Sequence, residues 1–267
     1  MTLEIEPLEL RRPKTGFAAE VMAELAPRYD AMTNHPIVED VVAGVASMEL
    51  IRGFTKEFIP IVRGTYRRMS MRLQHCAAHD YELQNALIKE VAEEVFHTPM
   101  YYAFCKKIGL KMPGDFLEMY LPETYAFILF VDATSAARSA LEECCVRVFE
   151  EEAWDGFNNY SQHSSLVQTI SATGLALRGF PFASDKLAAG FQEHYGCSEK
   201  DVEFWSEHGT LDLEHADVGV DIVDRYATTP ELQRRAREAA TLSMELWLAQ
   251  WDAIYRKFGP KAQSQTQ

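Results

Sequence analysis

Apolar residues recur along most of the chain at mixed spacings of three and four, the period of one buried helix face. Between Phe54 and Met71 the spacing is clear, and Ser47 precedes this segment as a candidate N-cap. Pro60 should kink the helix, because proline lacks a backbone donor and crowds the preceding turn. Patterns typical of strands are nearly absent, so the sequence predicts an all-α protein.

Capping signals predict where the next helices begin and end. Asp80 is a candidate cap for a helix that runs toward His97. Thr98–Pro99 has the character of a cap followed by a first-turn proline, which predicts a restart of the helix. Gly109 marks the expected end of that second helix.

Later signals predict further helices and a single domain. Ser198 and Asp201 have the spacing of a capping box, and Thr229–Pro230 marks another restart. No segment rich in proline, glycine or serine divides the chain, so residues 1–260 are predicted to form one domain, followed by a disordered tail at 261–267. The later helices are expected at roughly 123–152, 162–179, 184–195, 199–226 and 230–257.

Net charge and hydropathy limit the kinds of molecule that the protein is expected to bind. The formal net charge of −14 gives a field that repels nucleic acid and anionic membranes. No apolar stretch reaches the roughly 18 residues that a membrane span needs. The first six residues are acidic where a signal peptide would be basic, so we expect a cytoplasmic protein without nucleic-acid or membrane partners.

The cysteines favour buried, reduced thiols. An odd number without a CxxC spacing argues against both a disulfide framework and a structural zinc site. The five cysteines are Cys76, Cys105, Cys144, Cys145 and Cys197.

One candidate site lies at the end of the helix expected after residue 80. Glu90, Glu94 and His97 are separated by four and three residues, so one helix face can present all three side chains. These residue types bind divalent metals. The alternative is a solvated acidic face, because Glu93 lies in the same segment.

A second candidate site lies in the helix expected at 199–226. His208, Asp212 and His215 occupy positions i, i+4 and i+7, so two imidazoles and a carboxylate project from one stripe. The alternative is a polar surface stripe, which also holds Glu207, Glu214 and Asp217. Together the two segments match the way that bundle-core iron sites are assembled from facing helices. A set of His and carboxylate ligands with open positions suits non-heme Fe(II), one ion or two, with dioxygen as co-substrate.

These motifs resemble the heme-oxygenase-like diiron oxidases, a group that includes a 1-alkene-forming fatty-acid decarboxylase and a para-aminobenzoate synthase. The stretch with Trp205, Glu207, His208, Asp212 and His215 is similar to the last metal-binding helix of that group. The stretch from Glu94 through His97 and Tyr101 to Gly109 is similar to its other ligand helix. The resemblance covers roughly residues 35–255 and implies a bundle of seven to eight helices.

The chain also departs from the pattern of that group. Carboxylate ligands expected near Arg63 and Arg178 are arginines here, and one residue of 150–152 (all Glu) is a candidate replacement ligand. Two guanidinium groups would repel two divalent cations, which favours a reduced metal site. The arginines then either clamp an anionic substrate or pair with surplus carboxylates.

The resemblance implies an iron-dependent, dioxygen-activating oxidase or oxygenase that acts on a small carboxylate or amino-acid-like molecule. Two alternatives stay open: a metal-independent oxidase similar to the pyrroloquinoline quinone synthase, and a degenerate, non-catalytic partner protein. The superfamily usually forms homodimers, and we expect one here. Two further residues have counterparts in the superfamily: His35, as a heme ligand or a structural residue, and Glu245, similar to a carboxylate of the thiaminase II proteins.

Overall fold

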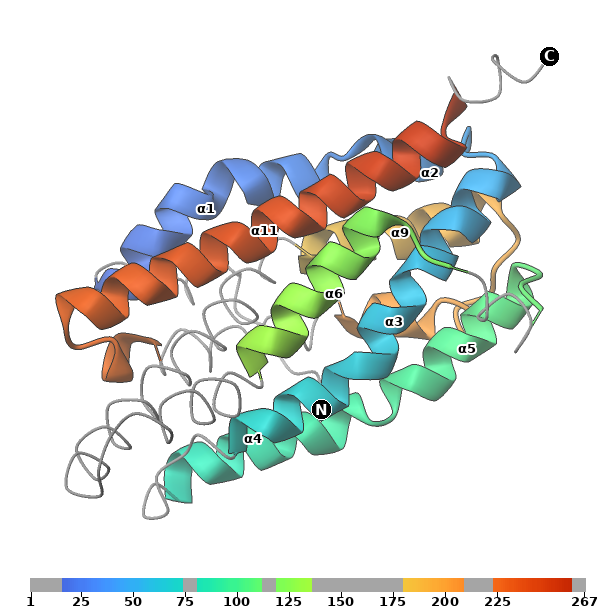
Figure 1. Cartoon of the computed structure of the whole chain (residues 1–267). Helices are drawn as coiled ribbons and strands as arrows, with labels where there is room; N and C mark the ends of the chain where they lie inside the picture. Colours follow the sequence, from blue (N-terminus) through green and yellow to red (C-terminus); the bar gives the residue numbers. More distant parts are fainter. Residues whose placement is uncertain (1–15, 74–80, 112–118, 136–179, 209–222, 261–267) are drawn as a thin grey trace, which may run out of the picture.

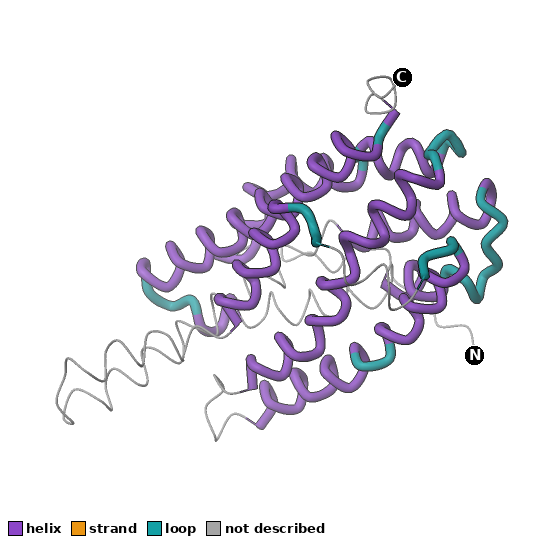
Figure 2. Tube along the Cα trace, turned by 45° about the vertical axis from the view of Figure 1, so that its right-hand side comes forward, coloured by secondary structure: helices purple, strands orange, loops and turns teal. Residues whose placement is uncertain are grey.

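A computed structural model describes residues 16–73, 81–111, 119–135, 180–208 and 223–260, and within these ranges helix is the only regular secondary structure (Figure 2). The all-α prediction is therefore confirmed. None of the helices in these ranges is both long and apolar enough to cross a bilayer. The elements are α1 (Phe17–Thr33), α2 (Pro36–Val42), α3 (Met48–Arg72), α4 (Tyr81–Glu94), α5 (His97–Lys107), α6 (Pro122–Ser135), α9 (Phe180–His194) and α11 (Pro230–Phe258).

Helix α3 occupies the centre of the bundle. It packs against α11 and α6 on one side and against α4 and α5 on the other (Figure 1). Helix α11 runs the length of the molecule with α1 and α6 beside it, and α9 packs on α1 and α2. Helix α3 therefore lies between the two groups of helices.

Two of the predicted N-caps are confirmed. The Ser47 hydroxyl accepts a hydrogen bond from Leu50 N at 3.1 Å and caps α3, which continues as helix through Pro60. Thr229 caps α11 in the same way, with Pro230 in the first turn. These contacts satisfy backbone donors that a helix start leaves without partners.

The capping box is also present, although the helix that follows begins later than predicted. Ser198 N donates to the Asp201 carboxylate at 2.8 Å, and Asp201 N donates back to the Ser198 hydroxyl at 3.3 Å. Residues 199–202 form turns, and the helical segment begins at residue 203. The box therefore closes the turn that leads into segment 203–208.

The predicted restart at Thr98–Pro99 is wrong by two residues and in its mechanism. Helix α5 begins at His97, and its N-cap, Phe96, makes no side-chain capping bond. The Thr98 hydroxyl oxygen is buried, and no described residue hydrogen-bonds to it. The break between α4 and α5 therefore falls before His97, in the exposed turn of Val95 and Phe96.

The other predicted helices are matched in part. Helix α6 covers the start of the predicted 123–152, α9 starts four residues before the predicted 184–195, and α11 agrees with the predicted 230–257 within one residue. Within the predicted 199–226, residues 203–208 and 223–226 are helical. The predicted helix at 162–179, the Asp80 cap and the tail lie outside the described residues, and the single domain at 1–260 stays a prediction.

The core is built around the buried indole of Trp205. Its ring lies 5.8 to 5.9 Å between centroids from Phe54 and Phe58 of α3. It also contacts Phe104 of α5 at 5.5 Å and Phe191 of α9 at 5.9 Å. Aromatic rings bury large apolar areas and favour such edge and offset contacts. One side chain thus fixes segment 203–208 against three helices.

Helix α5 adds two buried groups to this core. The Tyr101 hydroxyl donates to the Thr55 carbonyl at 2.8 Å, and burial raises the pKa of Tyr101 well above its usual value. Burial also raises the pKa of the Cys105 thiol to about 12. The prediction of buried, reduced thiols is confirmed for Cys105 and Cys197, and the other three cysteines lie outside the described residues.

A buried carboxylate fixes the start of α6. Glu57 of α3 accepts hydrogen bonds from Leu121 N at 2.9 Å and from the Thr124 hydroxyl at 2.6 Å. The Gln250 amide of α11 donates to the Thr124 hydroxyl and to the Glu57 carbonyl, both at 3.1 Å. Glu57 therefore acts as a remote cap that ties three helices together.

We expect Glu57→Ala to lower the free energy of unfolding by about 2–4 kcal/mol, because two buried donors lose their acceptor. Denaturant unfolding monitored by circular dichroism measures the change. Glu238→Ala removes an exposed carboxylate of α11 and serves as the control, with an expected change within about 0.5 kcal/mol. Equal losses in the two variants would contradict the capping role.

His35 caps α2 and is structural. Its Nδ1 accepts from Ile37 N at 3.2 Å, and its Nε2 lies 3.3 Å from the Asp252 carboxylate. Trp251 and Tyr255 pack edge-on against the ring. Burial lowers the pKa of His35 below its usual 6.5, although Asp252 opposes the shift. The ring is therefore neutral in the folded protein at neutral pH.

This shift makes stability depend on pH. As the pH falls, the unfolded chain binds a proton at His35 near pH 6.5, whereas the folded chain binds it only at a lower pH. The free energy of unfolding is therefore highest above pH 6.5 and decreases as the pH falls toward the pKa of the folded state. We expect His35→Asn, which retains a capping side chain, to flatten this decline by up to about 1.4 kcal/mol per pH unit. Denaturant midpoints between pH 7 and 5 measure this pH dependence. Parallel plots of midpoint against pH for the wild-type and the variant chain would contradict the prediction.

Candidate metal centre

The junction between α4 and α5 brings a carboxylate and an imidazole into the interior. Glu94 is the last residue of α4 and His97 the first of α5, and both side chains are buried. A two-residue turn, Val95 and Phe96, separates the two helices. Glu90 lies one turn before Glu94 on the same face of α4 and is also buried.

His208 approaches from segment 203–208. Its ring packs on Phe204 with centroids 4.1 Å apart, and its Nδ1 lies 2.6 Å from the Phe204 carbonyl oxygen. Phe204 also contacts the His97 ring edge-on, and the neighbouring Trp205 carbonyl accepts from the Ser184 hydroxyl of α9. The aromatic core thus sets the position of His208.

Glu94, His97 and His208 meet at one point. One ligand atom from each lies within 4.8 Å of the others, and the two imidazole rings have centroids 4.2 Å apart. The three side chains are 4%, 2% and 7% exposed. Three titratable groups so deeply buried and so close together are costly unless they share hydrogen bonds or a cation.

The hydrogen bonds define which nitrogen of each imidazole is available. A carbonyl oxygen only accepts, so His208 donates its Nδ1–H to Phe204. Glu94 lies 2.8 Å from His97 Nδ1, and an ionised carboxylate likewise only accepts. With Nδ1 as the donor, the nitrogen of each ring that can bind a metal is Nε2. Metal-binding histidines are commonly oriented in this way by a carboxylate or a backbone carbonyl.

This donor set fits a divalent iron ion. Two imidazole nitrogens and one carboxylate are the ligand types that non-heme Fe(II) uses, and open positions remain on the metal. Glu94 has two carboxylate oxygens, and one of them lies 2.8 Å from His97 Nδ1. The structure thus brings together three of the predicted metal-site residues, with Glu90 beside them but outside the group that meets within 4.8 Å.

Glu207 is a neighbour of this group that was not among the predicted metal ligands and that only the alternative interpretation assigned to a surface stripe. Its carboxylate lies 3.7 Å from His97 Nε2, and its side chain is 37% exposed. Its position next to His208 is the feature of the sequence from which Glu207 could have been predicted to lie near the group. The predicted residues Asp212, His215 and Arg178, and the candidate ligands at 150–152, lie outside the described residues.

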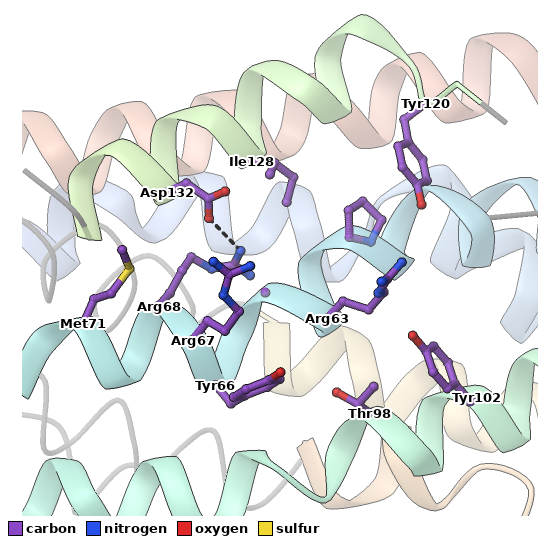
Figure 3. A pocket seen from close by; sticks show the side chains of 12 residues that line it. Arg63, Tyr66, Arg67, Arg68, Met71, Thr98, Tyr102, Tyr120, Ile128 and Asp132 are labelled. Atoms are coloured by element: carbon purple, nitrogen blue, oxygen red, sulfur yellow. Dashed lines mark hydrogen bonds and ion pairs between the residues drawn. The ribbon is translucent and has the colours of Figure 1, made fainter. Parts of the chain in front are cut away.

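A cavity of about 730 Å³ lies between α3, α5 and α6 (Figure 3). Arg63, Arg67 and Arg68 line it from α3, and Tyr102 lines it from α5. Thr98, the residue after His97, also faces the cavity, so α5 carries the metal candidate on one face and a cavity wall on the next. Arg67 and Arg68 were not predicted, because their facing depends on the register of α3.

Arg68 differs from the other two arginines. Its guanidinium is buried, 3.0 Å from Asp132 of α6, and also hydrogen-bonds the Ile61 carbonyl oxygen. Gly64 makes room for it, since a methyl group at that position would overlap the guanidinium. No described carboxylate lies within ion-pairing distance of Arg63 or Arg67, and both side chains are exposed.

Glu245 does not reach the interior. It pairs with Arg28 of α1 on the surface, where the Arg28 Nε–Glu245 Oε1 distance is 2.8 Å, and its side chain is 54% exposed. The likeness to a thiaminase II carboxylate is therefore not matched by its position.

The sequence profile of the iron-containing redox enzymes matches residues 52–248, and the chain belongs to that family. A segment of 102 residues is 31% identical to the bifunctional coenzyme PQQ synthesis protein C/D of Methylorubrum extorquens strain AM1. That match covers 38% of this chain and 27% of the Methylorubrum protein, so the chain spans little more than a quarter of its relative.

Solved structures share the fold at low sequence identity. A TenA homolog from Pseudomonas syringae pv. tomato DC3000 superposes with a TM-score of 0.72 at 14% identity, covering 94% of this chain and 98% of that one. A domain of unknown function with a heme oxygenase-like fold, from Shewanella denitrificans, gives 0.67 at 15% identity, covering 90% and 92%. The predicted heme-oxygenase-like bundle is therefore confirmed.

We expect His97→Ala and His208→Ala each to weaken Fe(II) binding at least tenfold, because each removes one of two imidazole ligands. Anaerobic equilibrium dialysis of the purified chain measures the affinity. His194→Gln is the control, since His194 lies at the end of α9 beside the Val42 carbonyl. Binding that is unchanged in both alanine variants would exclude this group as the iron site.

Proposed function

We propose that the chain is an iron-dependent oxidase or oxygenase that activates dioxygen and acts on a small anionic molecule. The observation that carries this proposal is the buried meeting of Glu94, His97 and His208 in a member of the iron-containing redox enzyme family. A bound Fe(II) with open coordination positions would supply dioxygen activation.

The residues around the group would orient the ligands and exclude water. Glu94 and the Phe204 carbonyl would hold the two Nδ1–H groups, which would leave both Nε2 atoms available to a bound ion. Phe204 and Tyr101 pack 4.6 Å apart beside them and form a dry aromatic wall. A dry wall protects a reactive oxidant from unproductive reaction with water.

The substrate would enter the cavity between α3, α5 and α6. Arg63 is exposed there without a described carboxylate partner, which favours the substrate clamp over internal pairing. The guanidinium fork matches a carboxylate. Arg178 remains part of the proposal, together with Asp212 and His215 as further ligands. Thr98 follows His97 directly, so a molecule in the cavity would lie close to the metal group.

Anaerobic loading of the apoprotein with Fe(II), followed by dioxygen, tests the proposal. We expect one or two iron ions per chain by elemental analysis, and a change in the visible spectrum when dioxygen is added. Two ions would indicate a complete two-iron site despite the arginines. One ion would fit a reduced site with arginines that bind substrate. A chain that takes up no iron would contradict the proposal.

A second candidate is an oxidase that needs no metal, in which histidines and arginines bind a substrate that itself reacts with dioxygen. The exposed guanidiniums of Arg63 and Arg67 favour it, and the partial likeness to a coenzyme PQQ synthesis protein agrees. Turnover that survives exhaustive chelation would support this candidate over the first.

A further inference from the structure

The charge of the cavity is opposite to that of the protein. The chain carries a formal charge of −14, yet the described lining of the cavity holds three arginines and one carboxylate. Asp132 is already paired with Arg68, so the charges of Arg63 and Arg67 remain uncompensated among the described lining residues. Two positive charges in a partly enclosed space favour a ligand with two negative charges.

The spacing of the two arginines defines how such a ligand would bind. Arg63 and Arg67 are four residues apart on α3, so they lie one above the other on the same helix face. Figure 3 shows the Arg63 side chain directed toward Tyr102 and Tyr120, whereas the Arg67 side chain extends toward Arg68. The two guanidiniums therefore lie at different parts of the cavity.

The other residues that line the cavity suit a flat, unsaturated ligand. Tyr66, Tyr102 and Tyr120 line the cavity together with the apolar side chains of Ile128 and Met71. Burial raises the pKa of Tyr102 and Tyr120 although Arg63 opposes the shift, so both phenols stay protonated and can donate. Rings contribute stacking and edge contacts that a compact anion such as phosphate cannot use.

We propose that this cavity binds a planar, ring-bearing dianion, with Arg63 and Arg67 each taking one anionic group. The proposal rests on the proposed function for what happens to the molecule, and it narrows the substrate from carboxylates in general to dianions. A zwitterionic amino acid fits poorly, because its ammonium group needs a carboxylate and the described lining offers only the one held by Arg68. The volume of about 730 Å³ falls within the range of small-molecule sites.

Calorimetric titration of the chelator-treated full chain tests the proposal without iron or dioxygen. The probes are benzene-1,3-dicarboxylate, benzoate, phenylalanine and inorganic phosphate. We expect the dicarboxylate to bind at least tenfold more tightly than each of the other three. Equal affinity for benzoate would overturn the assignment of a dianion. Equal affinity for phosphate would overturn the requirement for a ring, and equal affinity for phenylalanine would overturn the preference over zwitterions.

Variants connect the binding to the two arginines. Arg63→Ala and Arg67→Ala should each weaken dicarboxylate binding tenfold or more, while Arg63→Lys should retain part of it, because the charge stays and the fork is lost. Arg256→Ala is the control, since Arg256 pairs with Glu123 on the surface. Unchanged binding in both cavity variants would overturn the proposal. These titrations contain no metal. A negative result in them would therefore not contradict the proposed iron site, and dicarboxylate binding would still hold if the chain took up no iron.

Discussion

The packing of Trp205 determines where the chemistry of this protein can lie. Its ring is held by aromatic side chains of α3, α5 and α9, and this contact places segment 203–208 against the start of α5. His208 is three residues further along the same segment, so its approach to His97 follows from the core packing. The buried aromatic cluster therefore positions the histidines of the candidate metal centre.

Helix α3 connects this core with the cavity. One of its faces carries Phe54 and Phe58 into the aromatic cluster, another carries Glu57 to the start of α6, and a third presents Arg63 and Arg67. A shift of this helix along its axis would therefore move the core, the α6 cap and the cavity together. The ion pair between the buried Arg68 and the exposed Asp132, accommodated by Gly64, adds a polar contact between α3 and α6.

Sequence patterns predicted the local features better than the distant ones. Ser47, the Ser198–Asp201 pair and Thr229 each act within four residues, so their roles are visible in the sequence. The meeting of Glu94, His97 and His208 was predictable because helical spacing and family resemblance agreed. Glu57 and Arg68 were not predictable, since their partners lie 64 residues away in the chain and their facing depends on tertiary packing. Thr98 was wrongly predicted as an N-cap, because it stands directly before Pro99 as a capping residue would, whereas its hydroxyl is buried.

The raised pKa of the Cys105 thiol lowers its reactivity toward metals and oxidants. With a pKa of about 12, only on the order of one thiol in 10⁵ is ionised at neutral pH. Iron prefers the thiolate, and oxidation to sulfenic acid also proceeds through it, so this sulfur is a poor ligand and a poor target. Helix α5 can therefore carry a cysteine two turns from a candidate iron ligand without competing for the metal and with little susceptibility to oxidation.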